Sequence, residues 1–183
     1  MKVLRTEIPD VLILEPKVFG DERGFFLERY NKREFLNATG LDVEFVQDNH
    51  SRSTHNVLRG LHYQVTQPQG KLVWAIEGQI YDVAVDLRKS SATFGKWTGF
   101  LLSAESRQMA WIPPGFAHGF LVVSAAAEIL YKASDYYAPE HERTLLWNDP
   151  KLGIQWPLEP GVPPVLAGKD RKGGALDAAE VFA

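Results

Sequence analysis

Histidine is the side chain in this sequence with the widest range of chemistry, because it exchanges protons near neutral pH and also binds metal ions. The five histidines are His50, His55, His62, His118 and His141. Their spacing contains neither a His-x-His pair nor a His-Glu-x-x-His motif, which are strong local signals of a metal site. A three-histidine site assembled from distant strands stays open as an alternative, but no local spacing supports it. We therefore expect no bound metal.

Four segments place polar side chains among strongly apolar neighbours, and they are residues 20–28, 45–51, 58–64 and 111–120. Side chains alternate along a strand, so Gln47 and Asn49 are expected on one face. In the last segment, two prolines form a rigid turn that leads to His118. Each segment alone is compatible with a strand face exposed to water. Together they are typical of a small barrel with a polar ligand cavity.

Short runs rich in Val, Ile, Phe, Tyr and Trp must position these residues, and turn residues separate the runs. They predict strands at Val11–Val18, Gly24–Tyr30, Val43–Ser51, Val57–Gln64, Leu72–Ile76, Ile80–Leu87, Lys96–Leu102, Gln108–Ile112, Gly119–Val123 and Glu128–Tyr136. One helix is expected over Asn31–Ala38, ended by Gly40. Strands at this density predict an all-β sandwich or barrel.

The length of 183 residues predicts a single domain over residues 1–183, since domains of about 100–200 residues are the norm. Pro and Gly become more frequent after residue 139, and the strand pattern fades there. We expect residues 139–183 to form a C-terminal segment that wraps the barrel, with partial disorder in residues 173–183.

Composition excludes several function classes. Without cysteine, disulfides, thiolate metal sites and cysteine nucleophiles are impossible, and the sequence fits a reducing compartment. The 20 basic residues do not outnumber the 23 acidic ones, so no positive excess favours nucleic acid. Walker, dinucleotide-binding and Gly-x-Ser-x-Gly motifs are absent, and the longest apolar stretch is far shorter than the ~20 residues that span a bilayer. These features predict a cytoplasmic protein that binds neither nucleic acid nor membrane.

A series of motifs runs through the polar segments and beyond them. They are Asp21-Glu22-Arg23-Gly24-Phe25-Phe26, Gln47-Asp48-Asn49-His50-Ser51, Leu58-Arg59-Gly60-Leu61-His62-Tyr63-Gln64, Gly70-Lys71-Leu72-Val73, Ile112-Pro113-Pro114-Gly115-Phe116-Ala117-His118-Gly119-Phe120, and Trp147-Asn148-Asp149-Pro150 with Ile154-Gln155-Trp156-Pro157. In this order they resemble the dTDP-4-dehydrorhamnose 3,5-epimerase family. The resemblance implies a cupin-type jelly-roll β-barrel with short peripheral helices, a homodimer, and no metal or redox cofactor.

The resemblance also implies a reaction. The family's substrate, dTDP-4-dehydro-6-deoxy-D-glucose, carries a C4 ketone that acidifies the protons on C3 and C5. Inversion of both carbons through enolates gives dTDP-4-dehydro-L-rhamnose, and no cofactor is needed because the ketone itself accepts the electrons. Two alternatives stay open: an epimerase that inverts only C3 or only C5 of another deoxysugar nucleotide, and a non-catalytic jelly-roll module that binds a sugar.

Four residues match the family's catalytic positions. His62 matches the base, and Asp170 matches the carboxylate that orients its ring. Lys71 matches the cation near the C4 oxygen, and Tyr131 matches the acid on the opposite face of the sugar. A neutral imidazole suits proton abstraction at neutral pH, and a cation stabilises a developing enolate.

Ten further residues match substrate-binding positions, and they are Arg23, Phe26, Glu28, Gln47, Asn49, Arg59, His118, Tyr137, Glu142 and Lys169. The three cations among them suit the diphosphate, and Tyr137 matches the residue that stacks on thymine.

Three geometric expectations concern the strands. Arg59 and His62 have opposite parity, so both reach one cavity only if Gly60 allows a bulge. Tyr131 and Tyr137 share a face and lie ~20 Å apart if their strand stays extended. An exposed strand edge around Val11–Leu14 is expected to pair with a partner chain.

Overall fold

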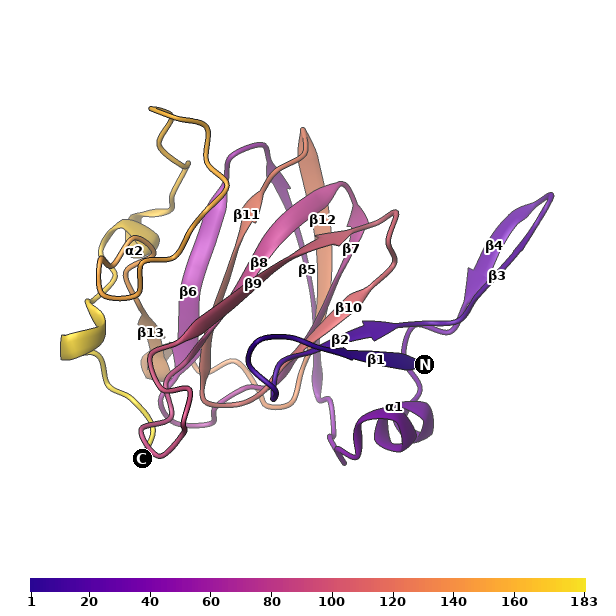
Figure 1. The fold of residues 1–183 in the computed structure, drawn as a ribbon, viewed down its shortest axis with the longest axis horizontal. Coiled ribbons are helices and arrows are strands. Elements are labelled where there is room, and N and C mark those ends of the chain that lie inside the picture. Colours follow the sequence, from indigo (N-terminus) through magenta and orange to yellow (C-terminus); the bar gives the residue numbers. More distant parts are fainter.

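Two antiparallel sheets face each other in the computed structural model, which describes all residues, 1–183 (Figure 1). The first sheet has the order β1 (Lys2–Arg5), β2 (Leu12–Glu15), β10 (Met109–Ile112), β7 (Lys71–Glu77), β12 (Ala126–Ala133) and β5 (Gln47–Thr54). The second has the order β13 (Glu142–Thr144), β6 (Leu58–Gln64), β11 (Phe116–Val122), β8 (Gln79–Asp86) and β9 (Trp97–Ser103). This architecture confirms the predicted all-β jelly-roll barrel.

The main core lies between the two sheets, where alternate residues such as Val73, Ala84 and Phe120 point inward and are buried. The opposite face of the first sheet is covered by α1 (Lys32–Thr39), whose Phe35 is 1% exposed. Asn31 caps this helix, because its side chain accepts hydrogen bonds from two backbone N–H groups of the first turn. The helix ends at Gly40, as predicted.

The N-terminal strand prediction is wrong in its extent. The expected strand Val11–Val18 is interrupted, and an unpredicted strand, β1, precedes it. β2 pairs with β1 on one side and with β10 on the other. The Val11–Leu14 region is therefore inside the sheet, and its expected pairing with a partner chain is wrong because its backbone groups already have partners.

A two-stranded hairpin, β3 (Val18–Asp21) and β4 (Gly24–Leu27), projects away from the barrel (Figure 1). We call residues 18–27 the arm. Its strands pair only with each other. Phe19, Phe25 and Phe26 are 53%, 58% and 69% exposed, so the arm presents apolar rings to its surroundings.

Two strands near the cavity differ from their predicted limits. β11 begins at Phe116, so His118 lies inside it rather than before it. β12 ends at Ala133, and Tyr137 lies in the following turn. The Gln64 side chain binds this turn, because it donates to the Tyr136 carbonyl at 3.2 Å and accepts from the Ala138 N–H at 2.9 Å. Tyr131 and Tyr137 therefore do not lie on one extended strand, and the distance expected between them on such a strand does not apply.

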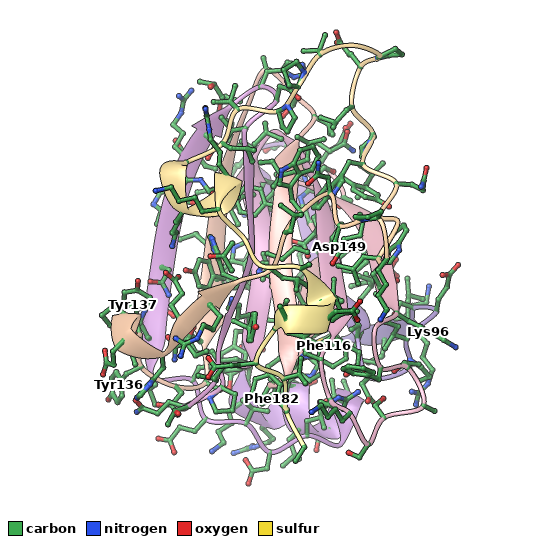
Figure 2. The ribbon with its side chains drawn as sticks, turned by 90° about the vertical axis from the view of Figure 1, so that its left-hand side faces the viewer. Lys96, Phe116, Tyr136, Tyr137, Asp149 and Phe182 are labelled. Atoms are coloured by element: carbon green, nitrogen blue, oxygen red, sulfur yellow. The ribbon has the colours of Figure 1, made fainter.

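The C-terminal segment crosses the outer face of the second sheet (Figure 2). It contains η1 (Pro139–His141), α2 (Gly168–Arg171) and η2 (Leu176–Ala178). The expected partial disorder of residues 173–183 is wrong. Leu176 is buried and donates its N–H to the Asp149 carboxylate at 2.7 Å, and the Phe182 N–H donates to the Leu87 carbonyl at 3.0 Å.

Candidate active site

A cavity of about 630 Å³ lies between the sheets, a volume typical of small-molecule sites. β5, β6, β7, β11 and β12 line it, together with the loop around residues 165–170. Most of the predicted site residues border this cavity, and they are Gln47, Asn49, Arg59, His62, Lys71, His118, Tyr131, Tyr137, Glu142, Lys169 and Asp170. Residues separated by more than 120 positions thus meet in one site.

His62 and Asp170 form a short hydrogen bond of 2.6 Å between Nε2 and Oδ1. Asp170 is 1% exposed and comes from α2, which the C-terminal segment brings against β6. An ionised carboxylate only accepts hydrogen bonds, so Nε2 of His62 carries the proton. Nδ1 is then the nitrogen left to take a proton from a ligand in the cavity.

A bulge in β6 brings Arg59 and His62 to the same cavity, as predicted. Phe120 of β11 is opposite Arg59, and His118 is opposite His62, so three steps along β6 match two along β11. Gly60 occupies the extra position with a φ of 125°. A Cβ there would lie 2.5 Å from the Gly119 Cα, so only glycine fits without displacement of the neighbouring strand.

Lys71 begins β7, and its ammonium makes no hydrogen bond or ion pair within the chain. Burial lowers the pKa of Lys71 to about 8. The carboxylates of Asp82 and Glu142 oppose this shift, whereas the charge of Lys169 adds to it. An unpaired cation beside the cavity is suited to stabilise negative charge that develops on a bound ligand.

Tyr131 lies on β12 in the first sheet, whereas His62 lies on β6 in the second. The two side chains therefore border the cavity from opposite sheets. Burial raises the pKa of the Tyr131 phenol, and the nearby Glu142 carboxylate raises it further. The phenol consequently keeps its proton at neutral pH and can donate it.

The cavity rim holds a charged cluster. The Lys169 ammonium lies 2.8 Å from the Glu142 carboxylate, which also accepts a hydrogen bond from the Tyr137 hydroxyl at 3.3 Å. The Tyr137 ring is half exposed, and with Tyr136 it lies at one edge of the barrel (Figure 2). Gln47 holds it there by accepting the Tyr137 N–H at 2.9 Å.

Arg23, Phe26 and Glu28 do not border this cavity. Arg23 sits at the tip of the arm, where its side chain is 86% exposed and pairs with Asp21. Glu28 follows the arm and accepts a hydrogen bond from Asn31 at 3.2 Å. Their predicted contact with substrate cannot occur in the cavity of their own chain in this arrangement.

Asp82 was not predicted as a site residue; it is fully buried and binds Nε2 of His118 at 2.9 and 3.1 Å. A signal was present in the sequence, because a carboxylate in the apolar run Ile80–Leu87 requires a partner when the strand is buried. Two residues that do border the cavity, Ser51 and Gln69, were not predicted either.

Comparison with known proteins decides the family. The family model described as dTDP-4-dehydrorhamnose 3,5-epimerase matches residues 5–178. The chain belongs to this family. It is an isomerase that acts on carbohydrates, as the resemblance implied.

Relatives of this epimerase cover it almost completely. The dTDP-4-dehydrorhamnose 3,5-epimerase of Pseudomonas aeruginosa is 59% identical over 182 residues, which are 100% of this chain and 99% of that protein. The crystal structure of the Legionella pneumophila epimerase in complex with dTDP-4-keto-L-rhamnose has a TM-score of 0.94 at 47% identity, with 98% and 94% of the two chains covered. A 3'-monoepimerase from Streptomyces bikiniensis in complex with dTDP-quinovose has a TM-score of 0.87 at 32% identity, with 97% and 88% covered.

The epimerase has no group of three His, Asp or Glu side chains close enough together to hold a metal ion. None of its helices has the length and apolar character needed to cross a bilayer.

Proposed function

We propose that this chain inverts C3 and C5 of dTDP-4-dehydro-6-deoxy-D-glucose, with His62 as the base and Tyr131 as the acid. The observation that carries the proposal is that these two groups border one cavity from opposite sheets. Inversion of a carbon requires that a proton leaves one face and another arrives at the opposite face. A base and an acid on the same wall would return the proton to the face that it left.

In the first step, Nδ1 of His62 takes the proton from C3 or C5. The electron pair of the broken C–H bond moves through the ring carbon to the C4 oxygen, which becomes an enolate. Asp170 stabilises the imidazolium that forms, because its carboxylate holds the other ring nitrogen at 2.6 Å. The Lys71 ammonium stabilises the enolate oxygen.

In the second step, the Tyr131 phenol gives its proton to the same carbon from the other face, and the C4 ketone is restored. Burial supports this role, because it raises the pKa of Tyr131 and keeps the phenol protonated until an enolate is present. Solvent then returns a proton to the phenolate and takes one from His62, so protons balance over the cycle.

We assign the nucleotide to the rim. Arg59 and Lys169 border the cavity and provide positive charge for a diphosphate. Tyr137 presents a half-exposed ring on which thymine can stack. When the diphosphate binds, the Lys169 ammonium must either leave the Glu142 carboxylate or contact the carboxylate and a phosphate oxygen together.

We further propose a homodimer in which the arm of each chain reaches the cavity of its partner. Arg23 and Phe26 match substrate-binding positions, yet they are exposed and remote from the cavity of their own chain. An exposed arm with three phenylalanines is typical of a segment that docks on another chain.

Mixing two variants tests the arm. His62→Ala chains keep an intact arm, and Arg23→Ala chains keep an intact cavity. Mixed dimers of these two chains contain one complete site, so random exchange restores about a quarter of the wild-type sites. If the mixture is as inactive as its components although light scattering shows dimers, the arm does not serve the partner.

Incubation with the keto-sugar nucleotide in D2O, followed by NMR, separates the three candidate functions. The proposal predicts deuterium at both C3 and C5 and an L-configured product. Label at one carbon alone indicates an epimerase that inverts a single carbon. The related protein from Streptomyces bikiniensis, which has the same fold, is a 3'-monoepimerase. No label indicates a module that only binds sugar. A cytoplasmic location and the absence of nucleic-acid partners stay predictions of the sequence.

A further inference from the structure

His118, which borders the cavity beside His62, belongs to a second histidine–carboxylate pair. Nε2 of His118 lies 2.9 and 3.1 Å from the two oxygens of Asp82. His118 is directly opposite His62 in the β6–β11 ladder, so the two pairs are neighbours on one wall. The roles assigned above use only the first pair.

Asp82, like Asp170, is a deeply buried carboxylate whose hydrogen-bonded partner is a histidine. It is fully buried on β8, on the same inward face as the core residue Ala84. A buried carboxylate is costly unless charges or donors compensate it. Asp82 has one hydrogen-bonded partner, His118, and no arginine or lysine lies within ion-pair distance of it.

Lys71 is the second group that depends on Asp82. Its ammonium has no direct partner, and Asp82 is the strongest attractive charge that acts on it. The other charges that face Lys71 are Glu142, which attracts it, and Lys169, which repels it. The other titratable or charged side chains that line the cavity are His50, Arg59, His62, His118, Tyr131, Tyr137 and Asp170. Asp82 therefore acts on two groups that face the same ligand.

We propose that Asp82 is a positioning residue of the epimerisation, which orients His118 toward a hydroxyl group of the sugar and supplies the counter-charge for Lys71, the group that polarises the C4 oxygen. The inference rests on the function proposed above and adds a residue that has no contact with substrate. Because Nε2 of His118 donates to Asp82, Nδ1 carries a lone pair and can accept a hydrogen bond from a hydroxyl group of the substrate.

The variant Asp82→Asn keeps the size of the side chain and removes its charge. We expect the saturated rate of C3 and C5 exchange to fall by at least about tenfold, because His118 loses the charged acceptor that orients its ring and Lys71 loses its counter-charge. We also expect the pH above which the rate declines to move downward, because Lys71 loses the charge that opposes its deprotonation. Binding of dTDP alone should stay unchanged, since Asp82 lies away from the rim.

Asp86→Asn is the matched control. Asp86, like Asp82, is fully buried on β8 and does not border the cavity, but its side chain pairs with Arg88 and Thr93 rather than with a cavity residue. This variant should lower the melting temperature and leave the alkaline decline where the wild-type enzyme has it. If Asp82→Asn lowers stability like Asp86→Asn but shifts neither the saturated rate nor the alkaline decline, the proposal is overturned and Asp82 is structural.

Two NMR measurements separate this proposal from the function on which it rests, because neither requires turnover. In the wild-type protein, nitrogen shifts of His118 should place its proton on Nε2. Titration of the Lys71 side chain should give a lower pKa in Asp82→Asn than in the wild-type protein. If Asp82→Asn does not fold, the wild-type spectrum still decides, because a proton on Nδ1 alone contradicts the proposed hydrogen bond.

Discussion

Raising the pH should switch off this enzyme by deprotonating Lys71. Burial lowers the pKa of Lys71 to about 8, whereas an exposed lysine titrates near 10.4. The enolate needs the charged form, because a neutral amine cannot balance a negative oxygen. On the alkaline side of the pH profile, activity should therefore be full below pH 7 and decline as the pH rises through 8.

The size of this effect follows from the pKa. With a pKa of about 8, about 90% of Lys71 is charged at pH 7 and about 10% at pH 9. The saturated rate should fall about ninefold between these two values. A lysine with an ordinary pKa would lose only a few per cent of its charge over the same range.

Deuterium exchange at C3 and C5 at saturating substrate measures this decline, and an enzyme-free sample corrects for enolisation by base. Lys71→Arg is the matched control, because arginine keeps its charge at every pH used. This variant should be slower than the wild-type enzyme, since a planar guanidinium differs in shape from an ammonium, but its rate should not decline between pH 7 and 9. A wild-type rate that stays level to pH 9.5 would falsify the role of Lys71.

Three further predictions concern the base, the bulge and a buried carboxylate. His62→Ala should reduce exchange at both carbons by about 100-fold or more, whereas His55→Ala, outside the cavity, should retain the wild-type rate. If NMR shows that these two variants exchange at the same rate, His62 is not the base. Gly60→Ala should lower the free energy of unfolding by about 2–4 kcal/mol, because it combines a positive φ with a backbone clash, and Gly24→Ala, with a φ of 128° but open space, should cost less in the same urea titration. Asp86 has a pKa of about 2: burial favours a higher value, but hydrogen bonds from its neighbours outweigh it. This stabilisation, about 2 kcal/mol, is present above pH 4 and is lost as the pH falls through 2, so the stability gap between wild type and Asp86→Asn should close in acid; a gap that is the same at pH 7 and pH 2 contradicts this account.

Local rules predicted the parts of the site that depend on one strand at a time. Alternation places Gln47 and Asn49 on the same face of β5, where both border the cavity. The parity conflict between Arg59 and His62 predicted a bulge before any pairing partner was known, and the β6–β11 register contains it. Both inferences need only the period of a strand and the freedom of glycine.

Features that depend on packing between distant elements escaped the sequence analysis. The Val11–Leu14 region looks like a free edge because the short strand β1, which covers it, has no clear alternation. β12 seemed to continue to Tyr136, since nothing local indicates that Gln64 binds the turn after Ala133. The partner of Asp82 likewise depends on the register between β8 and β11.

The central claim is that the base and the acid act from opposite walls of one cavity, and Tyr131→Phe tests it most directly. This variant removes the proton donor and leaves His62 and Lys71 in place. In D2O, we predict that it returns D-configured substrate labelled with deuterium, because His62 still exchanges protons on its own face while inversion is slowed. Formation of the L-configured product at the wild-type rate would contradict the account.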